Sequence, residues 1–380
     1  MNSTERRQAR YLRRRDRREK KRQKFIGTLP GYDDVFTYRN LYDAFSLCKN
    51  GVMWKSSIQS YQINLPVNTY DIFERLRNCT YKSRGFVNFK ICERGKMRNI
   101  QSVHISERCV QRCLCDHYLI PLMSHNLIYD NGASIKGKGT DFCLGRLKKH
   151  LTDHYRKYGT EGYILLYDFS NYFGNIDHEA LYGITDKLIT DERLNKLYHQ
   201  FVDAFDTGLG LGSQISQISA VTFANRIDHM FKDKMGIKGY GRYMDDGYII
   251  ANDLDTINKC KDALNKVCME LKITINPNKL KVCKLKSTFT FLKKRISLKS
   301  SGKVVMRLSR KNIKSARKRL YKLRELLDAE RVTLENVEQA YRSWRYSVKK
   351  YKNYKSIIQL DNLYNSLFVE PFRYGGAYGL

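Results

Sequence analysis

Residues 239–253 read GYGRYMDDGYIIAND, in which two adjacent acids, Asp245 and Asp246, lie between an aromatic run and a second apolar run. This pattern predicts a tight β-hairpin that carries carboxylates at its tip. Adjacent strand residues point to opposite faces, so one acid can face a reaction centre while the other faces away. Taken alone, an acidic hairpin tip is usually a solvated turn.

A third acid changes that interpretation. Asp168 ends the apolar run 163–167 and is followed by Phe169-Ser170-Asn171-Tyr172-Phe173. If this strand lies beside the hairpin, three carboxylates meet and repel one another. Such a cluster is stable only when cations sit in it.

The composition points to a folded protein with a polyanionic partner. The 380 residues are 42% hydrophobic, and 70 Lys and Arg against 38 Asp and Glu give a formal charge of +32. Self-repulsion of that size indicates nucleic acid or an anionic membrane as the neutralising partner. No apolar stretch approaches the roughly 18 residues that span a bilayer, and no apolar segment follows the N-terminal charges. We therefore expect a cytoplasmic protein without a membrane partner.

The 10 cysteines include no Cys-x-x-Cys pair. Cys109, Cys113 and Cys115 lie near His104 and His117, but their segment has the apolar period of a helix. Buried free thiols explain them better than a metal site does, and they fit a reducing compartment.

The first 25 residues form a basic arm with few apolar side chains. Its twelve cations are Arg6, Arg7, Arg10, Arg13, Arg14, Arg15, Arg17, Arg18, Lys20, Lys21, Arg22 and Lys24. One interpretation is a disordered solubilising tail, and the other is an arm that orders on RNA.

Four patterns follow along the chain. The stretch FVNFKICERGKMRNI (86–100) predicts a two-stranded ribbon with a basic turn, and a helical period covers 107–122. Residues 161–298 read as strand, helices, hairpin, helix and strand, which suits an α+β sheet with helices on one face. Beyond about residue 300 the chain reads as basic amphipathic helices.

These motifs resemble those of the reverse transcriptases, in particular the bacterial lineage related to group II introns. The resemblance implies an α+β right-hand polymerase architecture with a palm built on an antiparallel sheet. The implied parts are the arm (1–25), fingers (26–160), palm with primer-grip element (161–298), and a helical thumb with a basic C-terminal region (299–380).

The resemblance also implies two-metal nucleotidyl transfer by Asp168, Asp245 and Asp246. Asp168 and Asp245 would bridge two Mg²⁺ ions, for which Mn²⁺ is an alternative. The carbonyl of Phe169 would help to hold the triphosphate-side ion, and Asp246 would be more peripheral. Hard carboxylate oxygens are the ligands that Mg²⁺ prefers.

Phe173, five residues after Asp168, matches a steric gate whose ring would collide with a 2′-hydroxyl; the alternative is a core aromatic. Residues 208–217 match the Gly-rich element near the template and nascent base pair. Here Leu211 replaces the usual Gln and Gln217 the usual Pro, a form that resembles diversity-generating retroelement and phage-defence enzymes. The expected contacts from this element are Leu211, Gly212, Ser216 and Gln217 with template or primer, and Gln214 with the nucleotide.

Single residues outside these motifs also match positions of the family. On the ribbon, Lys96 and Arg98 resemble a clamp on the triphosphate, with a solvated charged turn as the alternative. Lys279 matches a lysine that protonates pyrophosphate. Phe291 and Leu292 resemble a primer grip, although Lys293 stands where the family has Gly, and Tyr243 and Met244 are expected beside template or primer.

The expected partners are a structured noncoding or template RNA, an RNA–DNA hybrid and deoxynucleoside triphosphates; a protein partner or a second copy stays open. The expected function is RNA-directed DNA synthesis from a dedicated RNA, in an antiphage-defence system or a diversity-generating retroelement. A retron-type enzyme, an inactive polymerase relic that scaffolds RNA, and an unrelated basic RNA-binding protein are the alternatives.

Overall fold

The structure is a computed structural model in which residues 3–93, 96–351 and 353–369 are described. Its helices are α1 (Ser3–Ile26), α2 (Tyr32–Val35), α3 (Tyr38–Cys48), α4 (Ser56–Ile63), α5 (Leu65–Arg77), α6 (Ile105–Leu114), α7 (Ile120–His125), α8 (Thr140–Tyr158), α9 (His178–Thr185), α10 (Glu192–Asp203), α11 (Gln214–Phe223), α12 (Asn225–His229), α13 (Leu254–Glu270), α14 (Arg310–Asp328), α15 (Leu334–Val348) and α16 (Tyr354–Phe368). Its strands are β1 (Phe86–Glu93), β2 (Lys96–Val103), β3 (Tyr163–Tyr167), β4 (Gly239–Tyr243), β5 (Asp246–Ala251), β6 (Lys281–Lys284), β7 (Phe289–Phe291), β8 (Lys294–Leu298) and β9 (Val304–Leu308).

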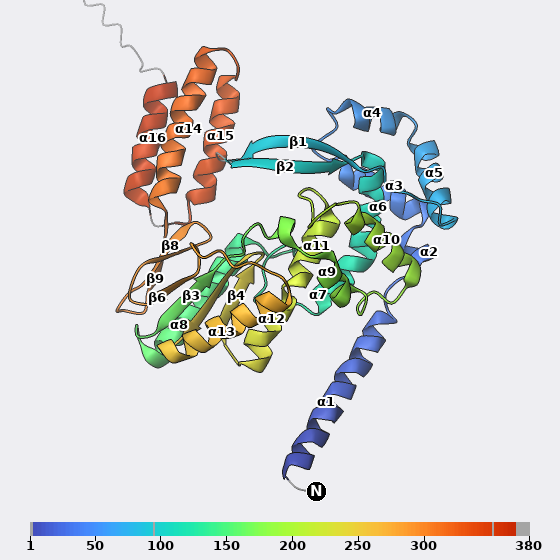
Figure 1. The fold of residues 1–380 in the computed structure, drawn as a ribbon. Coiled ribbons are helices and arrows are strands. Elements are labelled where there is room, and N and C mark those ends of the chain that lie inside the picture. The colour runs from blue at the N-terminus through green and yellow to red at the C-terminus, as the bar shows by residue number, and fades with distance from the viewer. Residues whose placement is uncertain (1–2, 94–95, 352, 370–380) are drawn as a thin grey trace, which may run out of the picture.

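A four-stranded antiparallel sheet forms the centre, in the order β4-β5-β3-β6. Leu165 and Ile249 point to one face, which packs against α13, whereas Leu166 and Tyr248 point to the other, which packs against α8. Figure 1 shows α8 and α13 beside these strands. Because both faces are covered, β3 is apolar throughout rather than alternating.

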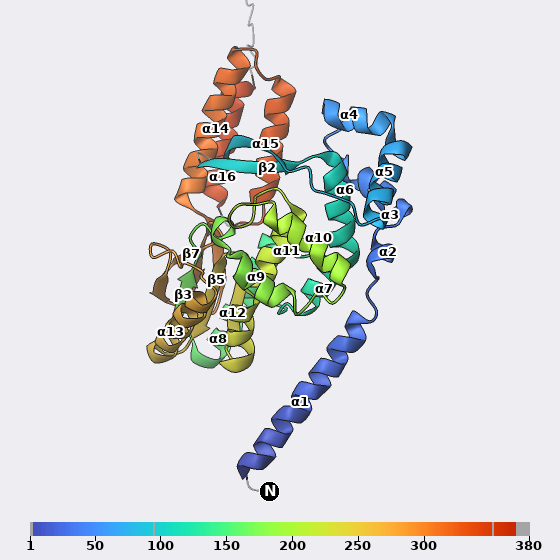
Figure 2. The ribbon, with the colours of Figure 1, turned by 45° about the vertical axis from the view of Figure 1, so that its right-hand side comes forward.

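The ribbon of β1 and β2 is antiparallel, with Phe86 opposite Val103 and Glu93 opposite Lys96. It confirms the hairpin expected from 86–100. In both views it extends away from the helices around α6 and toward the bundle of α14–α16 (Figures 1 and 2). The ribbon is held at its base, where the Phe86 ring stacks on Phe205 at 4.4 Å.

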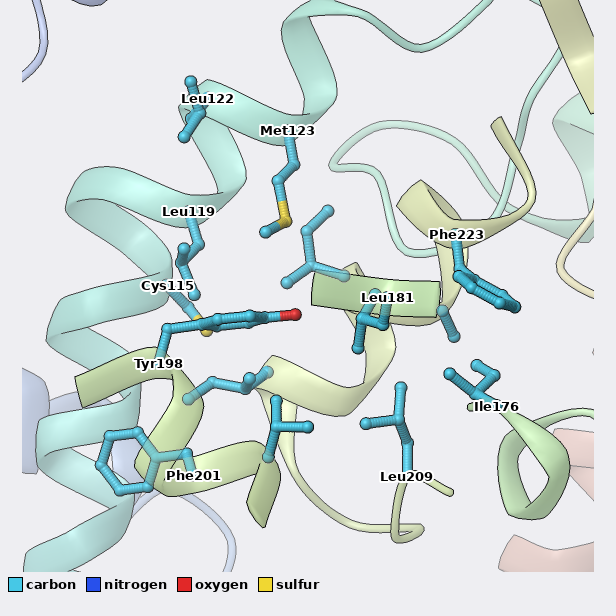
Figure 3. Close-up of a cluster of buried hydrophobic side chains, with 14 of the residues drawn as sticks. Cys115, Leu119, Leu122, Met123, Ile176, Leu181, Tyr198, Phe201, Leu209 and Phe223 are labelled. Carbon is cyan, nitrogen blue, oxygen red and sulfur yellow. The ribbon is translucent and has the colours of Figure 1, made fainter. Parts of the chain in front are cut away.

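The buried cluster on the α13 face of the sheet continues among α7, α9, α10, α11 and the π-helical turn Cys115–Leu119 that joins α6 to α7. Figure 3 shows Leu119 and Met123 facing Tyr198 and Leu181 across this core. The buried Tyr198 hydroxyl is 2.9 Å from the Ser219 hydroxyl, so the ring enters the core without leaving a polar atom unpaired. Leu209 in the same cluster ties the Gly-rich segment to this core.

The basic arm is a continuous helix, α1, that projects from the body (Figure 1). Arg, Lys, Gln and Glu are good helix formers, and neither Gly nor Pro interrupts the segment before Gly27. Its C-terminal end is docked: the Phe25 ring stacks on His125 at 3.7 Å, and Arg22 donates to the Lys187 carbonyl. The arm is therefore structured here, unlike the disordered tail considered from sequence.

The C-terminal region begins with a second sheet, β7-β8-β9, and continues into the bundle of α14–α16. The expectation of helix from about residue 300 is wrong for 304–308, because Val304 and Val305 extend this sheet as β9. The helices start at Arg310, where the Ser309 hydroxyl caps α14. The expected range of 299–380 extends past the described residues, which end at residue 369 and leave out residue 352.

Within the described ranges, no helix is both long enough and apolar enough to cross a bilayer. Cys109, Cys113 and Cys115 are buried free thiols, as expected. Burial is the first cause that raises the pKa of Cys115 well above its usual value, which suits inert packing residues rather than metal ligands.

Candidate active site

The tip of the β4–β5 hairpin is a two-residue turn. Tyr243 is the partner of Asp246, which leaves Met244 and Asp245 as the turn residues. Met244 has a φ of 55°, in the left-handed region that residues other than Gly and Asn rarely adopt. Surrounding contacts must therefore hold this backbone in place.

The end of β3 brings the third acid to this turn. The last β3–β5 pair is Tyr167 with Gly247, so the antiparallel register continued by one residue sets Asp168 opposite Asp246. Asp168 is 3% exposed, and its carbonyl accepts a hydrogen bond from Asn276 N at 2.8 Å. The cluster predicted from sequence thus forms at one end of the central sheet.

Burial and neighbouring charge perturb the two acids of the turn. Burial, followed by the charges of Asp245 and Asp168, raises the pKa of Asp246 to about 7. Burial and the charge of Asp168 also raise the pKa of Asp245. Both acids of the turn therefore hold their protons to a higher pH than a solvated carboxylate does.

One protein cation already enters the cluster, because Lys279 Nζ donates to Asp168 Oδ2. Burial would lower the pKa of this ammonium, but the bond to Asp168 and the charges of the three acids outweigh burial and raise it. Sequence reasoning placed Lys279 near the triphosphate, and the structure places it directly on Asp168.

The donor set fits divalent cations of the hard type. In the described part of the chain, no group of three or more His, Cys, Asp or Glu is arranged so that it could hold a metal ion by itself. Mg²⁺ in nucleotide sites takes only one or two protein carboxylates and completes its shell with water and phosphates. The mutual repulsion of Asp168, Asp245 and Asp246 is the observation that favours cation binding there.

The Gly-rich segment packs against the residue expected to be the gate. Leu209 N donates to the Phe173 carbonyl at 2.7 Å. Gly208 has a φ of 63°, and a Cβ on it would lie 2.5 Å from the Phe173 and Gly174 carbonyl oxygens. Only Gly fits this approach, which fixes the backbone of the turn that carries the Phe173 ring.

The same segment touches the base of the ribbon. Gln101 N, on β2, donates to the Leu211 carbonyl at 3.3 Å, and a Cβ on Gly210 would lie 2.5 Å from Gln101 Oε1. The Gly-rich segment, the turn that carries Phe173 and the base of the ribbon therefore form one packed unit.

The residues expected to contact nucleotide and template differ in how exposed they are. Gln214 Nε2 donates to Asp116 Oδ1 at 2.7 Å, and Ser216 is 1% exposed, whereas Gly212 and Gln217 are exposed. Leu211, Tyr243, Met244 and Leu292 are partly buried, and Phe291 is buried. Lys96 and Arg98 belong to β2, but their side chains lie outside the described part of the structure.

The hairpin expected to be a primer grip forms without the family's Gly. Leu292 and Lys293 make a two-residue turn between β7 and β8, with φ values of 45° and 63°. Phe291 meets Tyr248 edge to face, with ring centroids 5.2 Å apart. Because Tyr248 follows Asp246 by two residues on β5, this hairpin lies on the sheet face toward which the acids project.

Sequence reasoning missed a buried ion pair behind the acidic turn, Arg242 with Asp228, both fully buried. The signal was available: Arg242 is a charge inside a short strand whose flanking residues are aromatic or Gly.

These features define the class of the protein. Residues 84–296 match the family described as reverse transcriptase (RNA-dependent DNA polymerase), which is more than half of the chain. The chain belongs to this family, whose activity is that of a nucleotidyltransferase. The palm sheet, the ribbon and the C-terminal bundle are the parts of its right-hand fold.

Solved structures of telomerase are similar to the chain at low identity. The apo telomerase of Candida tropicalis truncated from its C-terminal domain has 15% identity and a TM-score of 0.47, and covers 58% of this chain and 54% of its own. The longer apo telomerase of Candida tropicalis has 13% identity and a TM-score of 0.49, covering 75% and 60%. Telomerase from Candida albicans, in complex with a fragment of telomeric RNA, has 11% identity and a TM-score of 0.48, covering 77% and 61%.

The chain thus spans little more than half the length of these telomerases. No curated protein matches it.

Proposed function

We propose that the protein makes cDNA from a dedicated RNA template by two-metal nucleotidyl transfer. The observation that carries this proposal is the meeting of Asp168, Asp245 and Asp246 at one end of the palm sheet, within a reverse transcriptase domain. In the reaction, the primer 3′-oxygen bonds to the α-phosphorus of a deoxynucleoside triphosphate. The bond to pyrophosphate breaks, and the 3′-hydroxyl loses its proton to solvent water.

Asp168 and Asp245 would hold two Mg²⁺ ions, with Mn²⁺ as a substitute, and Asp246 would be the peripheral acid. When bound, the ions activate the 3′-hydroxyl and neutralise the charge that develops on the triphosphate. The chain's own contribution is to hold the carboxylates at fixed positions on adjoining strands, which costs repulsion in the absence of cations.

Backbone geometry supports the carbonyl of Phe169 as a further ligand. The Asp168 carbonyl accepts from Asn276 N on one side of the strand. Consecutive strand carbonyls point to opposite sides, so the Phe169 carbonyl is directed toward β5 and the acidic turn.

Lys279 would protonate the leaving pyrophosphate. Its ammonium keeps its proton because the acids raise its pKa, and its contact with Asp168 places it at the site. Transfer of one proton from Nζ to a pyrophosphate oxygen leaves a neutral amine that solvent reprotonates.

Phe173 would exclude ribonucleotides. The proposal is supported by its place on the turn after Asp168 and by the Gly208 contact, which prevents that turn from moving aside.

We further assign residues 26–160 to the fingers, 161–298 to the palm and 299–380 to the thumb. Lys96, Arg98 and Gln214 would contact the nucleotide, the last after leaving Asp116. Leu211, Gly212, Gln217, Tyr243, Met244 and Leu292 would line the path of template and primer. Ser216 and Phe291 are buried, so they would support that path from beneath.

The arm would bind RNA through α1. A helix of 24 residues is about 36 Å long. Because α1 is docked at its C-terminal end, the rest of the helix can present its Arg and Lys side chains to RNA phosphates. Neutralising those phosphates supplies the free energy of binding.

For the biological role, we propose a defence system or a diversity-generating retroelement of the bacterial, group-II-intron-like lineage. This proposal is supported by Leu211 and Gln217, which replace the usual Gln and Pro. A retron-type enzyme and an inactive scaffold for RNA are the alternatives. The cytoplasmic location stays a prediction, as does a protein partner or a second copy.

Primer extension tests the reaction. A DNA primer annealed to an RNA template should be extended with deoxynucleotides in Mg²⁺ and not in excess EDTA. RNA binding without extension in either Mg²⁺ or Mn²⁺ would favour the inactive scaffold.

A further inference from the structure

Arg242 is the largest fully buried side chain of the described residues, with 0% of its surface exposed. It lies on β4, two residues before Met244. Charged side chains are almost never fully buried unless they are paired. Its environment therefore has to offer acceptors for the guanidinium from several directions.

Asp228, at 0% exposure on α12, supplies two of them. Arg242 Nε donates to Asp228 Oδ1 at 2.7 Å, and Nη2 donates to Oδ2 at 2.6 Å. The carboxylate also accepts from the Tyr240 hydroxyl at 2.6 Å and from Asn131 Nδ2 at 3.3 Å. The pair is thus bidentate, and its carboxylate is held by two further donors, Tyr240 on β4 and Asn131 in the segment before α8.

The remaining bonds lead to backbone carbonyls. Arg242 Nη2 donates to Val221 O at 3.0 Å, and Nη1 donates to Met244 O at 2.7 Å. Four of the five N–H groups of the guanidinium are used. A planar fork with fixed donor directions is needed for this set, which an ammonium cannot supply.

The bond to Met244 acts on the acidic turn itself. The Met244 carbonyl and the Asp245 N–H belong to one planar peptide unit. Fixing that carbonyl fixes the peptide that enters Asp245, and with it the direction in which the Asp245 side chain leaves the backbone. It also explains how Met244 is kept at a φ of 55°.

We propose that Arg242, anchored by Asp228, is a positioning residue that sets Asp245 for cation binding through the Met244–Asp245 peptide. Its guanidinium bonds to Asp228, Val221 and Met244, so it would act through the turn and not on the cation itself. The proposal rests on the proposed function, because it assigns Asp245 a cation to hold.

The test uses the full chain with Arg242→Met and Asp228→Leu combined. Removing both charges together avoids an unpaired buried ion, and apolar replacement of such pairs often preserves folding. In this variant the Met244 carbonyl loses the hydrogen bond that Arg242 donates. We expect the half-saturating Mg²⁺ concentration for primer extension to rise, and kcat to fall, each by about 10–100-fold, as for other groups that orient metal ligands.

Two other quantities should not move: the thermal midpoint in EDTA and the affinity for primer–template in EDTA. Arg193→Met is the matched control, because it also removes one guanidinium from a two-bond pair, with Asp33, but on the surface between α10 and α2. It should keep the wild-type Mg²⁺ dependence.

Wild-type kcat and Mg²⁺ dependence in the folded double variant would overturn the proposal. Should that variant not fold, Arg242→Gln with Asp228→Asn is measured instead; it keeps a neutral hydrogen bond between the two positions but loses the fork, and a wild-type result there would equally overturn it. Undiminished extension by Asp245→Ala would instead overturn the proposed function, so the two failures are distinguishable.

Discussion

Single side chains control the charge at the acidic end of the palm sheet. Lys279 offsets part of the repulsion by its contact with Asp168, yet the pKa of Asp246 still rises to about 7. The cluster is thus held together by the fold against its own charge, as expected for a site built for cations. The nearby Phe173 ring is held through its backbone by Gly208.

Phe173→Ala should admit ribonucleotides, because the ring would no longer meet the 2′-hydroxyl. Selectivity for deoxynucleotides, measured as the ratio of kcat/KM values, should fall by about 10–200-fold, the range that steric pockets supply. Tyr172→Phe is the control: it keeps a ring on the same turn and loses only the bond to the Ala220 carbonyl. A folded, active Phe173→Ala enzyme that still rejects ribonucleotides would refute the gate.

His150 should make stability depend on pH. Burial lowers its pKa from 6.5 to about 4, against the opposing charge of Asp130, with Lys232, Arg146 and the Tyr248 hydroxyl also facing the ring. The unfolded chain takes up a proton below pH 6.5, whereas the folded protein stays neutral down to about 4. The stability that neutral His150 contributes is therefore fully present above pH 6.5 and is lost as the pH falls to about 4.

The loss is at most about 3.5 kcal/mol, at 1.4 kcal/mol per pKa unit. Urea unfolding at pH 4.5 and pH 7 should show a smaller pH difference for His150→Gln than for the wild type. Equal differences would show that His150 does not stay neutral in the fold.

At the scale of elements, the pattern of residues predicted some parts well. The alternation in 86–100 and the acids between apolar runs in 239–253 predicted hairpins, because period and turn chemistry are local. The start of the C-terminal helices was misplaced, since β9 pairs with β8 and that pairing is not visible in Val304–Leu308 alone. The Arg242–Asp228 pair was missed because its partners lie 14 residues apart and meet only through the fold.

The β7–β8 turn is the element under the clearest strain. Lys293 has a φ of 63°, which costs a side chain about 1 kcal/mol and Gly nothing. Lys293→Gly should therefore raise the free energy of unfolding by about 1 kcal/mol in urea titration. Lys293→Ala removes the same side chain without relieving the backbone, so equal stabilities of the two variants would contradict the strain.

At the scale of the whole molecule, the charge of +32 is spread from α1 to the C-terminal bundle. The palm is a packed unit that the Gly-rich segment joins to the ribbon, whereas α1 is docked at its C-terminal end, through Arg22 and Phe25. The arm can therefore be removed with little effect on the site.

Deleting residues 1–20 leaves the docked Arg22 and Phe25 in place. RNA affinity should weaken, and the slope of log affinity against log salt should become less steep by about 0.7 for each RNA phosphate that the arm no longer neutralises. Extension of a pre-annealed primer at saturating enzyme should stay unchanged, because the acids lie elsewhere. Identical salt slopes for the two proteins would show that the arm is only a solubilising segment.

The most direct test of the central claim is primer extension by Asp245→Asn across a Mg²⁺ titration, with Asp255→Asn as the control. The two changes are chemically identical, but Asp255 is exposed on α13 and paired only with Lys259 in the same helix. A site in which Asp245 holds the cations predicts that Asp245→Asn loses extension by about 10³-fold or more at every Mg²⁺ concentration, since metal-ion catalysis supplies several kcal/mol of the rate enhancement. Asp255→Asn should match the wild type. Wild-type extension by a folded Asp245→Asn protein would contradict the claim.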